Sequence, residues 1–166
     1  MVPLREFLRR VPLLAGLLLA SIAGAQQVVP AAMPSADLDG EVTLDAAARA
    51  AVERREVRMD IHGTAWDCSG VALYDLLTAQ GRVPEEVRGV QLARYVLVTA
   101  RDGYRAMFSL AELAPRLAGH EVYVVDQCGG ADLGEDVGPL RLLVPGDAHP
   151  ARSMRQVESI HLRTAP

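Results

Sequence analysis

The chain has 166 residues, half of them hydrophobic, which is the size and composition of one globular domain with a substantial core. Its formal net charge of −4 argues against a nucleic-acid-binding protein, which needs a basic surface for phosphate contacts. All seventeen basic residues are arginine, and a compositional bias of the genome is the simplest account of that choice.

The first 25 residues have the three parts of an export signal. Arg5, Arg9 and Arg10 form a positive start, residues 11–22 are apolar, and Ala23-Gly24-Ala25 resembles a cleavage site. The apolar part is too short to span a bilayer comfortably, so we expect cleavage near Ala25 and no stable membrane span afterwards. The expected location is therefore the periplasm or the extracellular space.

Residues 26–40 are rich in Ala, Pro and Ser and are predicted to form a flexible linker. The folded domain is predicted over residues 41–163, as an α+β domain with more strand than helix. It begins with a short strand at 42–44, and Asp45 then caps a helix that ends near Arg54.

Alternating apolar and polar residues predict the next strand at 57–61, followed by a turn at His62-Gly63 and a returning strand at 64–68. Ser69-Gly70 is predicted to open a helix with one apolar side, which ends before Gly81. This part of the chain is therefore expected to form a β-hairpin followed by an amphipathic helix.

A second hairpin is predicted from an apolar run at 91–99, the turn Arg101-Asp102-Gly103 and a strand at 104–108. Ser109 and Glu112 have the spacing of a capping box, which predicts a short helix. The remaining predicted strands are at 121–126, 140–144 and 157–162, and the facing of the last is ambiguous.

The loop that follows Val144 has the composition of an anion site. A Pro-Gly-Asp turn ends the strand, and the loop then brings Arg152 and Arg155 around Ser153 and Met154. A planar guanidinium binds phosphate bidentately, and exposed backbone N–H groups add donors for the same anion. An ordinary surface loop is the other interpretation of the same residues.

Two further features have the same pair of interpretations. His149 lies in this loop, where a protonated imidazole would help to bind an anion, or where it is simply exposed. The hairpin that carries Arg101, Asp102, Tyr104 and Arg105 either borders the same cavity or is an exposed, ion-paired turn.

Cys68 and Cys128 are the two cysteines, and the sequence leaves three states open for them: a disulfide, free buried thiols, or a metal ligand at Cys68. An even number of cysteines in an exported protein favours the disulfide. Bridging them would close a loop of about 60 residues, which stabilises the fold by roughly 4 kcal/mol in the loop-entropy model.

Three stretches occur in an order that resembles one family. They are GVALYDLL at 70–77, RYVLVTARDGY at 94–104, and GPLRLLVPGD at 138–147 followed by ARSMRQVESIHL at 151–162. They are similar to the oxidoreductase molybdopterin-binding domain, the sulfite-oxidase fold, over roughly residues 41 to 163. The resemblance implies that fold, a molybdopterin cofactor and a molybdenum oxidoreductase activity.

The same resemblance implies the cofactor-binding residues. In that family a Ser-Val-Lys-like triplet contacts the phosphate of the pterin cofactor, and the matching triplet here is Ser153-Met154-Arg155, preceded by Arg152. The family's catalytic cysteine belongs near Val57-Arg58-Met59, where this sequence has no cysteine. A molybdenum centre of that class needs this soft thiolate ligand.

The expected function is therefore an exported domain that resembles molybdopterin-dependent oxidoreductases, binds a pterin phosphate or other small anion, and is not catalytic alone. A redox partner protein is a further expected partner. The second hypothesis is a cofactor-free sensor, binding or accessory module that uses the same fold.

Overall fold

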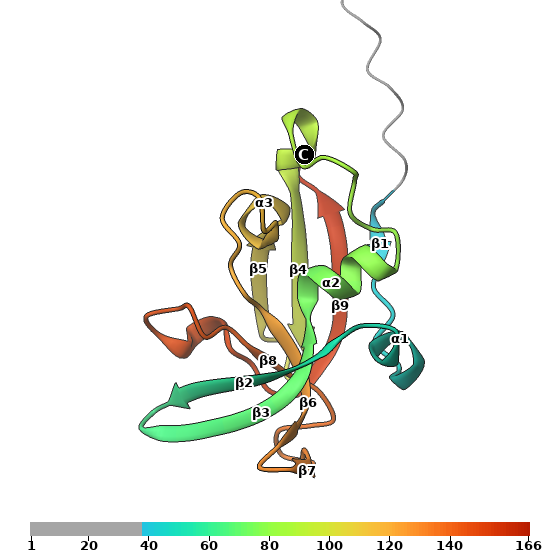
Figure 1. The fold of residues 1–166 in the computed structure, drawn as a ribbon. Coiled ribbons are helices and arrows are strands. Elements are labelled where there is room, and N and C mark those ends of the chain that lie inside the picture. The colour runs from blue at the N-terminus through green and yellow to red at the C-terminus, as the bar shows by residue number, and fades with distance from the viewer. Residues whose placement is uncertain (1–37) are drawn as a thin grey trace, which may run out of the picture. The chain divides into compact units, whose positions relative to one another are not determined.

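The computed structural model describes residues 38–166, which form a strand-rich α+β fold of two antiparallel sheets (Figure 1). The strands are β1 (Gly40–Glu41), β2 (Arg54–Ile61), β3 (Thr64–Ala72), β4 (Arg94–Ala100), β5 (Arg105–Ser109), β6 (Tyr123–Cys128), β7 (Ala131–Asp132), β8 (Arg141–Leu143) and β9 (Val157–Thr164). The helices are α1 (Ala46–Ala50), α2 (Leu73–Ala79) and α3 (Leu110–Leu113), with 3₁₀ turns η1 (Gly89–Ala93) and η2 (Pro150–Arg152). The predicted α+β class, richer in strand than in helix, is confirmed.

One sheet has the strand order β1-β9-β4-β5, and the other has the order β2-β3-β6-β7, with β8 paired to the free part of β6. The long β2–β3 hairpin extends away from the first sheet, and the chain between β8 and β9 loops back beside it (Figure 1). The predicted signal peptide at 1–25 lies outside the described residues, as does most of the predicted linker.

The packed region begins slightly earlier than predicted. Gly40 is already paired with Leu162 in β1, and Asp39 forms an ion pair with the buried Arg94 and accepts from the Thr164 N–H at 3.0 Å. The linker boundary at residue 40 and the strand expected at 42–44 are therefore both placed too late. Beyond the strand, the Val42 N–H still donates to a carbonyl of β9 at 2.8 Å.

Helix α1 starts where the sequence predicts and ends sooner. The Asp45 carboxylate accepts from the Ala48 N–H at 2.8 Å, which confirms the predicted cap. The helix stops at Ala50 rather than near Arg54, because Arg54 is already the first residue of β2 and pairs with Val71.

The predicted turn at His62-Gly63 joins β2 to β3, and both residues have positive φ angles, 54° and 80°. The helix predicted to open at Ser69-Gly70 is wrong, because β3 continues to Ala72 and α2 begins at Leu73. Gly70 is needed within the strand: a Cβ there would lie 2.2 Å from the carbonyl oxygen of Val124 on β6.

The second hairpin, β4–β5, forms as predicted, although residues 91–93 belong to η1 rather than to the strand. The capping box at the start of α3 is also confirmed. The Glu112 N–H donates to Ser109 Oγ and the Ser109 N–H donates to Glu112 Oε2, both at 3.0 Å. This geometry fixes Glu112 beside the end of β5.

The ambiguous facing of the last strand has a physical cause. The β4–β9 register pairs Thr99 with Ser159 and then Ala100 with Val157, so that Glu158 is an extra residue in β9. Because of this bulge, Val157 and Ile160 are both buried on the core side although an odd number of positions separates them. A strict period of two would have placed them on opposite faces.

Two clusters of buried apolar residues stabilise the fold. The larger includes Phe108, Leu76 and Ile160, and the smaller lies under the β2–β3–β6 strands and includes Met59, Val125 and Leu143.

Within residues 38–166, no helix combines the length and the apolar character that crossing a bilayer would require.

A disulfide joins Cys68 on β3 to Cys128, directly opposite on β6. The predicted disulfide is confirmed, and in this structure neither cysteine is a free thiol or a metal ligand. Such bonds are typical of periplasmic and extracellular proteins, which agrees with the predicted location.

Candidate anion-binding site

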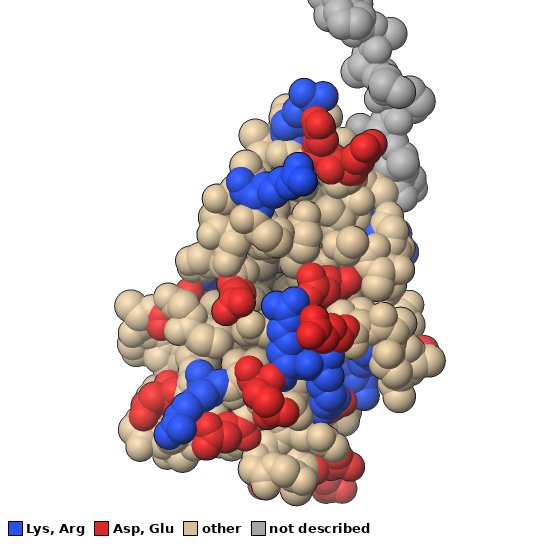
Figure 2. Space-filling model, viewed as in Figure 1, with Lys and Arg blue, Asp and Glu red and all other residues tan. Residues whose placement is uncertain are grey.

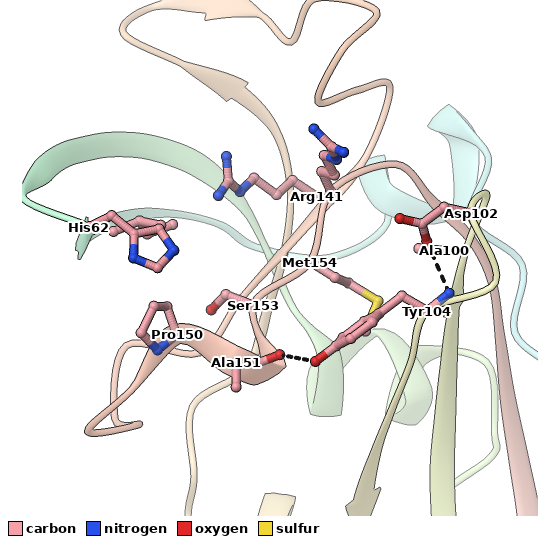
Figure 3. Close-up of a pocket in the computed structure, with 11 residues that line it drawn as sticks. His62, Ala100, Asp102, Tyr104, Arg141, Pro150, Ala151, Ser153 and Met154 are labelled. Atoms are coloured by element: carbon pink, nitrogen blue, oxygen red, sulfur yellow. Dashed lines mark hydrogen bonds between the residues drawn. The ribbon is translucent and has the colours of Figure 1, made fainter.

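A cavity of about 290 Å³ lies where three segments meet: the β2–β3 turn, the β4–β5 hairpin and the chain from β8 to β9 (Figure 3). We call it the arginine pocket. Its walls include three of the predicted site residues, Ser153, Met154 and Arg155. They also include Arg141 of β8, which the sequence analysis did not single out.

The backbone places two arginines next to each other in this pocket. Leu142 of β8 and Met154 form an antiparallel bridge, in which the N–H of each donates to the carbonyl of the other, at 2.8 and 3.1 Å. Arg141 and Arg155 flank this bridge and so lie opposite each other. Like charges in opposite positions of an antiparallel pair are destabilising.

Arg141 is the more unusual of the two, because it is buried without a carboxylate partner among the described residues. The residue is 7% exposed, and its Nε has no hydrogen-bond partner within residues 38–166. Its guanidinium lies 4.3 Å from the ring centroid of Trp66. Burial, and then the nearby charge of Arg155, lower the pKa of Arg141.

Within the described part of the chain, neither Arg141 nor Arg155 forms an ion pair with a carboxylate. Burying a charge without a partner costs several kcal/mol of folding free energy. Buried charges in proteins are therefore normally paired. Arg141 therefore lies on the pocket wall without a carboxylate to neutralise its charge.

Ser153 adds a hydroxyl whose donor is only weakly engaged. Its Oγ accepts from the Val144 N–H at 3.0 Å, and its O–H points to the sulfur of Met59 at 3.4 Å. A thioether is a weak acceptor, so the hydroxyl hydrogen can turn to a ligand oxygen without loss of a strong bond. Ser153 lies centrally among the labelled residues of Figure 3.

The opposite wall comes from the β4–β5 hairpin. Asp102 and Tyr104 line the pocket, which agrees with the interpretation that this hairpin borders the cavity, while Arg101 and Arg105 do not line it. The Tyr104 O–H donates to the Ala151 carbonyl at 2.7 Å, and Asp102 Oδ1 accepts from the Tyr104 N–H at 2.9 Å (Figure 3). Among the described lining residues, Asp102 is the one with a carboxylate.

Arg152, the remaining predicted site residue, has a different environment. Its guanidinium donates to both carboxylate oxygens of Asp147, at 2.8 and 2.6 Å, and to Glu112 at 2.7 Å. It also lies over the ring of the buried Phe108, 4.6 Å from the centroid. These contacts join the loop to α3 and β5, so we call this group the Arg152 brace.

The hydrogen bonds of the brace shift its pKa values. The bond to Asp147 is the main cause of the raised pKa of Arg152, and the bond from Arg152 is the main cause of the lowered pKa of Asp147. Both shifts favour the charged forms. Arg152 is therefore already saturated by carboxylates, whereas Arg141 and Arg155 are not.

The sequence did contain a signal for Arg141. It is the single charged residue in the apolar run 140–144, which was assigned to a buried strand. An arginine inside a buried strand is rare unless it is paired or binds something. The apolar run alone predicts a buried strand, whereas the cost of burying a charge within that strand is what indicates Arg141.

Elsewhere, basic and acidic side chains alternate over the face seen in Figure 2. That face therefore carries no broad patch of a single sign.

Comparison of the chain with protein-family models finds no match, and comparison with curated protein sequences finds none either.

Proposed function

We propose that this domain binds a small anion, such as phosphate or a phosphate ester, in the arginine pocket. The observation that carries the proposal is Arg141, buried and without a carboxylate partner beside Arg155. The two guanidiniums and the Ser153 hydroxyl provide donors to an oxyanion, and charge-assisted hydrogen bonds of this kind are the strong ones.

The resemblance to the molybdopterin-binding domain narrows the ligand to the phosphate of a pterin cofactor. The donors of Arg141, Ser153 and Arg155 fit that phosphate. The cavity of about 290 Å³ is at the lower end of the range for ligand pockets, about 300–1,000 Å³, so a larger cofactor would extend over its rim.

The metal end of such a cofactor is not matched. The expected thiolate position near Val57-Arg58-Met59 has no cysteine, and both cysteines of the chain are bonded to each other. The proposal is therefore anion binding on a sulfite-oxidase-like fold, with no oxygen-atom transfer by this chain. The disulfide favours the second candidate, a cofactor-free sensor, binding or accessory module that uses the same pocket.

The test is titration calorimetry of the purified protein with inorganic phosphate. We expect binding in the wild type and about a tenfold loss of affinity in Arg155→Gln, because a charge-assisted hydrogen bond is removed. Arg105→Gln is the matched control, since Arg105 is an exposed arginine outside the pocket. Equal phosphate affinity in both variants would refute the proposal.

A second measurement separates the two candidates. Protein isolated from its native host is assayed for molybdenum and for the fluorescence of oxidised pterin. Pterin near one per chain supports the cofactor-binding form of the proposal. Absence of pterin, with phosphate binding retained, supports the cofactor-free module.

A further inference from the structure

We infer that the tip of the β2–β3 hairpin positions two donors of the arginine pocket, through a cross-strand pair formed by Met59 and Trp66. This inference rests on the proposed function and adds two positioning residues to its site. Met59 on β2 and Trp66 on β3 are directly opposite each other. Trp66 contacts Arg141, and Met59 contacts Ser153, while neither of them lines the pocket itself.

The tip of the hairpin extends beyond its sheet. Pairing between β3 and β6 runs from Ala72 to Cys68, where the disulfide joins the two strands. Among the described residues, strand positions 59–61 and 64–66 pair only with each other. An isolated two-stranded hairpin is marginally stable, so contacts outside the hairpin have to fix the position of its tip.

The alternation of residues along the hairpin supplies those contacts from one face. Met59 is buried and Trp66 is partly buried, and both belong to the smaller apolar cluster. Their neighbours Arg58 and Asp67 are mostly exposed and form an ion pair of 3.5 Å. Because successive side chains of a strand point to opposite faces, the apolar face of the tip is the one that meets the pocket.

Trp66 holds Arg141 without neutralising it. The guanidinium lies over the indole ring, 4.3 Å from its centroid, and the negative face of an aromatic ring attracts a cation. A carboxylate in the same place would neutralise the charge and accept from the N–H groups. The ring does neither, so the charge and donors of Arg141 stay available to an anion.

Met59 has the corresponding place behind Ser153. Its sulfur lies 3.4 Å from Ser153 Oγ, which also accepts from the Val144 N–H at 3.0 Å. A thioether is a weak acceptor, so Met59 packs against the hydroxyl and competes little with a ligand. Two pocket donors thus rest on one cross-strand pair, and donors that are already held in place lose less freedom when an anion binds.

The hairpin tip also reaches the pocket directly. Ile61 and His62, which follow Met59 on the same strand and turn, are lining residues (Figure 3). A tip that was displaced from Arg141 and Ser153 would therefore open one wall of the cavity as well. The position of the tip and the affinity for an anion should depend on each other.

The first test is fluorescence, because Trp66 is the single tryptophan of the chain. The purified full chain is titrated with inorganic phosphate, and binding is measured in parallel by calorimetry. We expect the emission of Trp66 to change with the same midpoint as the calorimetric binding curve, since the anion neutralises the cation that lies over the ring.

The second test compares two substitutions of Trp66. Trp66→Leu should lower phosphate affinity by about three- to tenfold, whereas Trp66→Phe, which keeps an aromatic face, should retain most of the affinity. A purely structural role predicts no such rescue. Tyr95→Leu is the matched control, because Tyr95 is a partly buried aromatic residue on β4 that does not line the pocket. It should bind phosphate as the wild type does.

Met59 is tested in the same way. Met59→Ala removes the packing behind Ser153 and should lower phosphate affinity by about two- to fivefold. Met59→Leu keeps the volume of the side chain and should stay within about twofold of the wild type. Equal losses in Ala and Leu variants would contradict the packing role of Met59.

The outcomes separate this inference from the proposed function. Absence of phosphate binding by the wild type in calorimetry overturns both. Calorimetric binding with unchanged Trp66 emission, or with equal affinity in the wild type and Trp66→Leu, overturns the inference alone. Should Trp66→Leu fail to fold, the emission of the wild type during the phosphate titration decides.

Discussion

Arg141 and Arg152 lie in neighbouring parts of the same segment and differ in how their charge is neutralised. Arg152 is about one-third exposed, yet it is bound by two carboxylates and stacks on an aromatic ring. Arg141 is almost fully buried and has an aromatic ring beside it, but no carboxylate pairs with it among residues 38–166. Arg141, whose charge is the more costly to bury, therefore has fewer partners than Arg152.

This difference separates two roles that the spacing of arginines in the sequence cannot distinguish. A guanidinium whose donors are already occupied stabilises a loop and has little left to offer a ligand. A guanidinium that is desolvated and unpaired lowers stability until an anion binds, which is the usual sign of a functional position. The comparison predicts opposite consequences for the two substitutions.

Arg141→Met gives the largest expected effect. We expect phosphate affinity to fall about 10- to 100-fold, because charge-assisted hydrogen bonds are worth about 1.5–3 kcal/mol. The free energy of unfolding should stay within about 1 kcal/mol of the wild type or rise, because an apolar side chain of similar size replaces an unpaired buried charge. Calorimetry and urea denaturation measure the two quantities.

The control for this substitution is Arg94→Met. Arg94 is buried to a similar degree, but it has an acceptor in Asp39 and another in Gln91. Its loss should lower the free energy of unfolding by about 1–2 kcal/mol and leave phosphate affinity unchanged. If Arg141→Met destabilises the fold as much as Arg94→Met does, then Arg141 is a structural residue.

Arg152→Gln tests the other side of the comparison. It leaves Asp147, whose side chain is 12% exposed, without its cationic partner, so we expect the free energy of unfolding to fall by about 2 kcal/mol. Arg58→Gln is the control, because the Arg58–Asp67 pair is mostly exposed and should contribute about 0–0.5 kcal/mol. Urea denaturation measures the free energy of unfolding of both variants. Equal losses in the two would contradict a stabilising role for the Arg152 brace.

The brace also predicts a pH dependence of stability. The hydrogen bond from Arg152 lowers the pKa of Asp147 in the folded protein, so its stabilising effect is complete above the unfolded pKa of about 4. That effect is lost as the pH falls through the folded value. The stability difference between wild type and Asp147→Asn should therefore narrow as the pH falls below about 4, and a constant difference would contradict the assignment.

Much of the fold follows from local chemistry that the sequence displays. The turn at His62-Gly63, the Asp45 cap and the Ser109–Glu112 capping box all form as predicted, because each depends on residues within four positions. The helix expected at Ser69-Gly70 fails because a distant strand decides it. Gly70 stays extended since the backbone of β6 packs against it, and no local pattern indicates that contact.

The site is predictable in the same partial way. The loop itself was predicted as an anion site, and Ser153 and Arg155 do line a cavity. The different environments of Arg141 and Arg152 depend on the β8 bridge and on acids that come from elsewhere in the sequence, such as Glu112. Only the tertiary fold brings those groups together.

The smallest expected effect belongs to Tyr104→Phe, at the rim of the pocket. The Tyr104 hydroxyl donates to the Ala151 carbonyl at 2.7 Å, and the residue is half exposed. Because water replaces the lost bond, we expect the free energy of unfolding to fall by only about 0.5–1 kcal/mol. We expect phosphate affinity to change by less than about twofold, since in the proposed site the charged donors are those of Arg141 and Arg155. A loss of phosphate affinity as large as that of Arg141→Met would mean that the Tyr104 hydroxyl donates to the ligand. The β4–β5 hairpin would then contribute a binding residue.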